Sequence, residues 1–167
     1  KQFHKAAELY RNALEFEPDN AEYKVKLDEA ELREKVKDLR VQGEELMEHR
    51  DLDAASHCFA EALQLAPSNV AVQQDKAAAA RLQQAQELQQ AGEKHFASGN
   101  YEDAATLLHK SLQLDPDNKT VSDEEADAKR LKSAEEYKNA GIQAMRHHIR
   151  EDQSQGRQDQ GTDRRVL

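Results

Sequence analysis

The sequence predicts an all-α protein in which antiparallel helix pairs stack into a solenoid. The first observation is an internal repeat, because prolines and glycines recur at intervals of 49 residues: Pro18, Pro67 and Pro116, and Gly43, Gly92 and Gly141. The second is the abundance of Ala, Gln, Glu, Leu and Lys, which favour helices. The third is the lack of any sustained apolar-polar alternation, the pattern of a half-buried strand. Repeats of this kind bury apolar surface against their neighbours rather than in one central core.

Each unit ends in a short helix that stops before a proline. In the third unit this helix is expected over residues 101–114, followed by Pro116. Proline lacks a backbone donor and cannot continue a helix, and the asparagine two residues later can cap the next one. The first unit keeps only this second helix. Its repeated apolar and small positions are Ala6, Tyr10 and Ala13, with Pro18 behind them.

The spacing within one unit is specific. Counting from Gly92, the marked positions are Leu88, Phe96, Gly99, Tyr101, Ala104, Leu108 and Pro116. This pattern resembles a tetratricopeptide repeat. The unit around Gly43 follows it, except that Arg50-Asp51 replaces the Gly-Asn turn. The resemblance implies a helical repeat domain over residues 1–149, with two complete units and a half unit at each end. Residues 150–167 are predicted to be a polar, disordered tail.

The units are 15 residues longer than the 34 residues of a tetratricopeptide repeat. The additional residues, 21–35, 70–84 and 119–133, contain neither glycine nor proline. We therefore expect each first helix to begin early, so that residues 70–97 form one helix about twice as long as its partner. An apolar seam on the first such helix is predicted to pack on neighbouring long helices: Val25, Leu32, Val36, Leu39, Gly43 and Leu46. In the third, "KTVSDEEADAKR", the seam fails and a solvated face is expected. A spectrin-like bundle, with helices of equal length, is the alternative fold.

Composition limits the function. The formal charge of −9 lacks the concentrated basic face that nucleic-acid binding needs. No apolar stretch is long enough to span a membrane, and the lone Cys58 suits a reducing compartment, so a cytoplasmic location is expected. Cys58 is predicted to be a core thiol rather than a nucleophile, and the pair His147-His148 to lie on the surface. No enzymatic constellation, metal site or cofactor site is predicted.

The resemblance also implies a partner-binding groove lined by the first helices. The residues that would face it are Lys37, Arg40, Glu44, Met47, Gln86, Gln89, Glu93, Phe96, Lys138 and Met145. Periodic apolar residues such as Met47, Phe96 and Met145 can instead be core between helices. Chaperone-binding relatives grip a terminal carboxylate with a lysine three residues before the glycine and an asparagine directly after it. Glutamate or isoleucine takes the place of that asparagine here, which argues against this clamp.

The predicted function is a non-enzymatic interaction scaffold or adaptor that presents a helical groove to a partner peptide or helix. One alternative is a structural component of a cytoskeletal or ciliary assembly, with self-association. Co-chaperone activity is a weaker one. Any electrostatic partner is expected to be basic or to make mostly apolar contacts, given the net charge.

Overall fold

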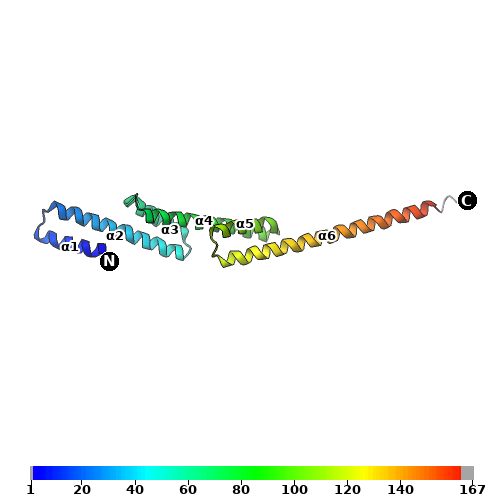
Figure 1. Cartoon of the computed structure of the whole chain (residues 1–167), viewed down its shortest axis with the longest axis horizontal. Coiled ribbons are helices and arrows are strands. Elements are labelled where there is room, and N and C mark those ends of the chain that lie inside the picture. The colour runs from blue at the N-terminus through cyan, green and yellow to red at the C-terminus, as the bar shows by residue number, and fades with distance from the viewer. Residues whose placement is uncertain (1, 163–167) are drawn as a thin grey trace. The chain divides into compact units, whose positions relative to one another are not determined.

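The structure, a computed structural model, describes the backbone of residues 2–162 and the side chains of residues 2–150. Over this range the secondary structure is helical: α1 (Gln2–Phe16), α2 (Ala21–Glu48), α3 (Leu52–Leu65), α4 (Val70–Ala97), α5 (Tyr101–Leu114) and α6 (Lys119–Thr162) (Figure 1). The all-α prediction is confirmed. Long and short helices alternate, with 28 residues in α2 and α4 and 14 in α3 and α5. These unequal lengths exclude a spectrin-like bundle.

The long helices run without a break through the additional residues of each unit. They begin at residues 21, 70 and 119, the interval seen in the sequence. The predicted bounds 70–97 and 101–114 match α4 and α5. Helix α6 continues to Thr162, past the expected end of the helical domain at residue 149, since no proline interrupts this polar stretch. Separation of residues 150–167 from the domain stays a prediction.

The chain divides into two compact units, Lys1–Glu87 and Leu88–Leu167, with the boundary inside α4. Unit 1 holds the packed pairs α1–α2 and α2–α3 together with the first part of α4, and unit 2 holds the end of α4 and the packed pair α5–α6. The two units therefore repeat the same arrangement of a first helix, a second helix and the next first helix.

Asparagines at the 49-residue interval cap the long helices, as expected. The Asn20 side chain accepts hydrogen bonds of 3.1 Å from the backbone N–H groups of Glu22 and Tyr23. The side chain of Asn69 accepts one of 3.3 Å from Val72 N–H, and Asn118 accepts its equivalent at the same distance. Each cap satisfies donors that the first turn of a helix leaves unpaired.

The turns before α3 and α5 need the left-handed backbone conformation. Gly99 adopts it with a φ of 76°, and Arg50 holds the equivalent place with a φ of 62°. Glycine enters this region without steric cost, whereas a side chain costs roughly 1–2 kcal/mol. The substitution of Arg50-Asp51 for Gly-Asn therefore keeps the turn but strains it. Asp51 offsets part of that cost by capping α3, since its side chain accepts from Ala54 N–H at 3.2 Å.

The core of unit 1 joins α2, α3 and the first part of α4. Its buried members are Val36, Ala55, Phe59, Ala62, Val72 and Ala79. Phe59 is fully buried and is among the largest such side chains. Because Val72 and Ala79 lie in the additional residues of α4, this segment is part of the core that it shares with α2 and the short helix α3.

The core of unit 2 repeats this pattern, and it overturns one expectation. Its buried members are Ala104, Ala105, Leu108, Val121 and Ala128. Val121 and Ala128 lie in the stretch expected to be solvated, yet both have 0% exposure. The prediction of a solvated face on α6 was wrong, because a valine and an alanine are enough for close packing on α5. Val121 and Ala128 are the equivalents of Val72 and Ala79 in α4.

The predicted seam of α2 is correct over only part of its length. Val36 and Gly43 are buried, and Leu39 and Leu46 pack against the core. Val25 and Leu32 are instead exposed, and Ala30 is the buried residue of that stretch. Alanines occupy this position in all three long helices, at residues 30, 79 and 128, and a small side chain lets the short helix approach.

Two glycines allow the closest approach within the helix pairs. A Cβ added at Gly43 would lie 2.5 Å from the ring of Phe59, and one at Gly92 would lie 2.8 Å from Leu108. The third member of the series, Gly141, meets nothing within 4 Å. The pairs α2–α3 and α4–α5 therefore require a residue without a side chain at Gly43 and Gly92, whereas α6 has no such requirement at Gly141.

We predict opposite effects for alanine at two of these glycines. Gly43→Ala should lower the free energy of unfolding by about 1 kcal/mol, because overpacking against Phe59 costs ~1–3 kcal/mol and exceeds the ~0.5–1 kcal/mol gained from helix propensity. Gly141→Ala should keep only that gain. Urea denaturation of both variants measures the difference. Equal stabilisation by the two alanines would contradict the close approach at Gly43.

Candidate partner-binding surface

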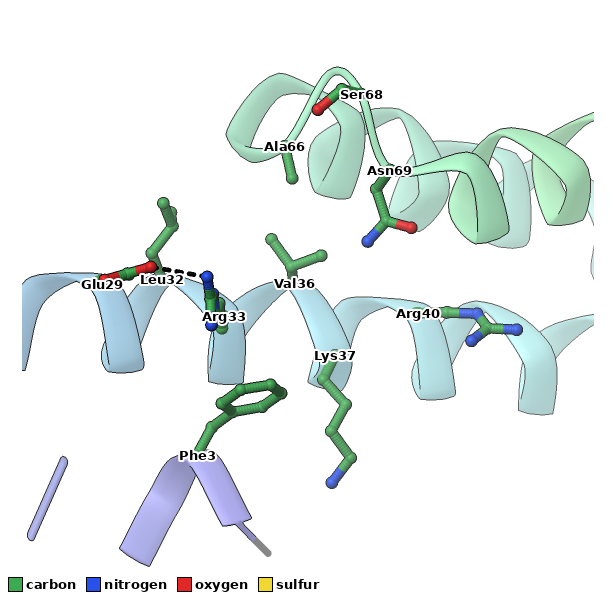
Figure 2. A pocket seen from close by; sticks show the side chains of 10 residues that line it. All are labelled: Phe3, Glu29, Leu32, Arg33, Val36, Lys37, Arg40, Ala66, Ser68 and Asn69. Carbon is green, nitrogen blue, oxygen red and sulfur yellow. Dashed lines mark hydrogen bonds and ion pairs between the residues drawn. The ribbon is translucent and has the colours of Figure 1, made fainter. Parts of the chain in front are cut away.

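A cleft of about 540 Å³ lies on α2 in unit 1 and includes two of the predicted groove residues, Lys37 and Arg40. Figure 2 shows its walls: α2 runs between Phe3 of α1 on one side and the turn between α3 and α4 on the other. The residues that line it are Phe3, Glu29, Leu32, Arg33, Val36, Lys37, Arg40, Ala66, Ser68 and Asn69. Three different segments of the repeat thus meet around one concave surface.

The cleft combines an apolar lining with cationic groups. Val36 and Ala66 point toward each other across it (Figure 2). Arg33 donates to the Glu29 carboxylate at 2.6 Å, and its guanidinium lies 5.8 Å from the ring centre of Phe3. Lys37 is exposed and makes no ion pair with any residue that the structure describes. Its ammonium is therefore available to an anionic group of a ligand.

Arg40 is already engaged within the protein. Its Nε donates to Asp75 on α4 at 2.5 Å, and an Nη lies 3.0 Å from a Glu44 oxygen. The hydrogen bond to Asp75 and the charges of both acids raise the pKa of Arg40 against the opposing effect of burial. This guanidinium links α2 to α4. Arg40 and Glu44 therefore make contacts within the protein at positions that were predicted to face a partner.

The equivalent positions of unit 2 lack this cation. Gln89, Glu93 and Glu124 follow Arg40, Glu44 and Asp75 by 49 residues. In unit 2 the Gln89 amide donates to the Glu93 carboxylate at 2.8 Å. Burial, and then the charge of Glu93, raise the pKa of Glu124, while a hydrogen bond with Gln89 acts in the opposite direction. Oε2 of Glu124 is buried and has no hydrogen-bond partner among the described residues.

The apolar row of the predicted groove separates into two kinds of residue. Met47 packs against the core of unit 1 and Phe96 against that of unit 2, where its ring meets Tyr101 edge-on at 5.5 Å. Both are half-buried. Met145 on α6 is 70% exposed. The core interpretation therefore describes Met47 and Phe96, and only Met145 presents its side chain to solvent.

The ten predicted residues are divided between the units. Lys37, Arg40, Glu44, Met47 and Gln86 belong to unit 1, and Gln89, Glu93, Phe96, Lys138 and Met145 to unit 2. Gln86 and Lys138 are exposed. Sequence reasoning missed the other walls of the cleft, the side chain of Phe3 and the turn at residues 66–69, because no repeat position marks a surface formed by three segments.

The remaining candidates from the sequence have ordinary structural roles. Cys58 is buried, and burial followed by the charge of Glu61 raises the pKa of its thiol, the opposite of an activated nucleophile. His147 and His148 are exposed on α6. The residues that the structure describes contain no group of three or more His, Cys, Asp or Glu that could hold a metal ion. Within the same residues, none of the helices has the length and apolar character needed to cross a membrane.

Replacement of the poorly satisfied glutamate should stabilise unit 2. Glu124→Gln should raise the free energy of unfolding at pH 7 by roughly 1 kcal/mol, because it removes the charge of a partly buried carboxylate whose Oε2 lacks a hydrogen-bond partner. Since the folded-state pKa of Glu124 is raised, the wild-type protein loses stability as the pH rises from the ordinary glutamate range through that higher value. The stability difference between Glu124→Gln and the wild-type protein should therefore shrink as the pH falls to the ordinary glutamate pKa range, where Glu124 is protonated in the folded protein. Thermal melts from pH 4 to pH 8 would measure this difference.

The matched control is Asp75→Asn in unit 1, which should be destabilising because it weakens the pairing of Arg40. A Glu124→Gln variant that is less stable than the wild-type protein at pH 7 would contradict the assignment of Glu124 as an uncompensated charge.

Truncation of the two apolar groove candidates should separate core from surface. Phe96→Ala should lower the free energy of unfolding by up to about 3 kcal/mol, at the low end for a phenylalanine because the ring is only half-buried. Met145→Ala should change it little. Urea denaturation provides the measurement, and unchanged stability of Phe96→Ala would show that the ring is a surface group.

Comparison with known proteins supports the repeat assignment. The family model for the tetratricopeptide repeat matches residues 85–118. No curated protein and no solved structure matches the chain. The matched stretch begins directly after the additional residues 70–84 and contains the end of α4, all of α5 and Pro116. It also contains Gly92 and Leu108, the close contact of this helix pair. The match therefore supports a tetratricopeptide repeat at residues 85–118 of this chain.

Proposed function

We propose that this chain is a non-enzymatic scaffold or adaptor that binds a peptide or helix of a partner protein on α2. A tetratricopeptide repeat is typical of protein–protein interaction modules. The observation that carries the finer proposal is the cleft of about 540 Å³ beside Lys37. Concave, largely apolar sites with a few polar groups are the usual form of a binding site.

The lining indicates the chemistry of the ligand. An apolar side chain fits between Val36 and Leu32, whose side chain is 42% exposed. A carboxylate on the same segment would pair with Lys37. This local preference differs from the basic partner expected from the net charge, because three cationic side chains, Arg33, Lys37 and Arg40, line this cleft beside a single acid, Glu29.

Other parts of the proposal follow the sequence. We expect neither a catalytic activity nor a nucleic-acid or membrane ligand, and a cytoplasmic location is proposed from the lone, buried Cys58. Co-chaperone activity through a carboxylate clamp is disfavoured, since Arg40 already pairs with Asp75 and Glu44.

Selection from a phage-displayed library of random peptides, followed by fluorescence anisotropy, tests the proposed cleft. Leu32→Asp should weaken the selected peptides at least about tenfold, or ~1.4 kcal/mol. Lys37→Glu should slow association and reduce its salt dependence for acidic peptides. The matched controls are Val25→Asp and Lys24→Glu, which alter exposed positions of α2 outside the cleft. Peptides that bind Leu32→Asp and Lys37→Glu as tightly as the wild-type protein would reject this site.

A further inference from the structure

Two acids of unit 2, Glu93 and Glu124, lack the cation that their equivalents in unit 1 hold. In unit 1 the Arg40 guanidinium donates from Nε to Asp75 at 2.5 Å, and one Nη lies 3.0 Å from a Glu44 oxygen. The two acidic positions recur 49 residues later, whereas the arginine does not. Unit 2 therefore keeps both negative charges without the group that neutralises them in unit 1.

Gln89 occupies the position of the arginine but cannot replace it. Its amide donates to Glu93 at 2.8 Å and forms a hydrogen bond with Glu124. An amide has two donor hydrogens and no charge, so the repulsion between the two carboxylates stays. Neither Glu93 nor Glu124 makes an ion pair with any residue that the structure describes. Both charges are therefore available to a cation from another molecule.

The two acids form a site with a buried end and an open end. Oε2 of Glu124 is buried and has no hydrogen-bond partner among the described residues. Glu93 is exposed, and Gln89 is half-buried between these extremes. Burial and the charge of Glu93 raise the pKa of Glu124, as expected for a carboxylate without a cation beside it. A donor that enters past Glu93 would satisfy the buried oxygen, which is costly to leave without a partner.

Unit 1 shows which kind of cation fits such a pair. Arg40 reaches its two acids with two different nitrogens of one planar group. A guanidinium fixes several donors in a fork, whereas a lysine ammonium is a compact and more strongly hydrated point charge. A guanidinium is therefore better suited to contact a buried oxygen and an exposed carboxylate together. The formal net charge of −9 also favours the approach of a basic partner.

We propose that Glu93 and Glu124 bind an arginine side chain of a partner protein, which takes in unit 2 the place that Arg40 holds in unit 1. The guanidinium donates to Oε2 of Glu124 and to the Glu93 carboxylate. This site is separate from the cleft on α2, whose lining prefers apolar and anionic groups, and it does not depend on that cleft. The unsatisfied oxygen of Glu124 lowers the stability of the free protein and is the group that the ligand completes.

NMR titration of the 167-residue chain with arginine blocked at both termini tests the site. The signals of residues 89, 93 and 124 should shift and saturate. Blocked citrulline carries a neutral urea in place of the guanidinium and should bind at least about tenfold more weakly, because charge-assisted hydrogen bonds are the stronger ones. The pKa of Glu124, followed by carboxyl NMR, should fall as arginine binds, since a cation favours the ionised form.

Gln89→Arg supplies the cation from the chain itself. It should raise the melting temperature and abolish the shifts caused by blocked arginine, because the new guanidinium reaches the same two acids. Glu124→Gln should weaken the binding of blocked arginine at least about tenfold by removing one of the two charges. The matched control is Gln84→Arg, which adds the same side chain at an exposed position on the opposite side of α4 from Glu93. This control should bind blocked arginine like the wild-type protein.

Three results would overturn the proposal: no saturable shift at residues 89, 93 and 124, equal binding of blocked arginine and blocked citrulline, or shifts that persist unchanged in Gln89→Arg. Failure of the peptide selection on the α2 cleft would alter none of these measurements, so the two sites are tested separately.

Discussion

The helix pairs depend on one close contact, between a glycine of the first helix and the largest fully buried side chain of the second. Phe59 and Leu108 are fully buried, and a single methyl group on Gly43 or Gly92 would intrude on them. Protein interiors are packed so closely that such an intrusion must displace a neighbour. The distance between the helices, and with it the position of every other contact in the pair, is therefore set by the absence of one side chain.

The extended first helices complete what this contact begins. A helix of 14 residues is marginal in water by itself, so α3 and α5 are stable only when both their sides are covered. Their own first helix covers one side at the glycine. The early part of the next long helix covers the other through a valine and an alanine, Val72 with Ala79 in one unit and Val121 with Ala128 in the other. The added residues are thus part of the core rather than a spacer.

Equivalent polar positions differ between the repeat units, although the apolar contacts recur. The position three residues before the glycine is Arg40, Gln89 or Lys138. Arg40 pairs with two acids, Glu44 on its own helix and Asp75 on α4. At its equivalent in unit 2, a glutamine leaves a buried glutamate oxygen unsatisfied. The same helix arrangement therefore holds the ion pairs of Arg40 with Glu44 and Asp75 in unit 1, but two neighbouring acids, Glu93 and Glu124, in unit 2. Function has to be argued from such individual sites rather than from the fold.

The sequence by itself determined the helices, their order and where the long helices begin, because proline stops, asparagine caps and glycine contacts act through local chemistry that recurs at a visible interval. The bounds of α4 and α5 and the burial of Cys58 could be predicted for this reason. The tertiary structure alone decided which side of each helix is covered. Val121 and Ala128 are too small to give a clear apolar period, and Phe96 occupies a position compatible with groove or core. The cleft beside Lys37 could not be predicted, because its walls come from three segments whose distance in space depends on how closely the helices pack.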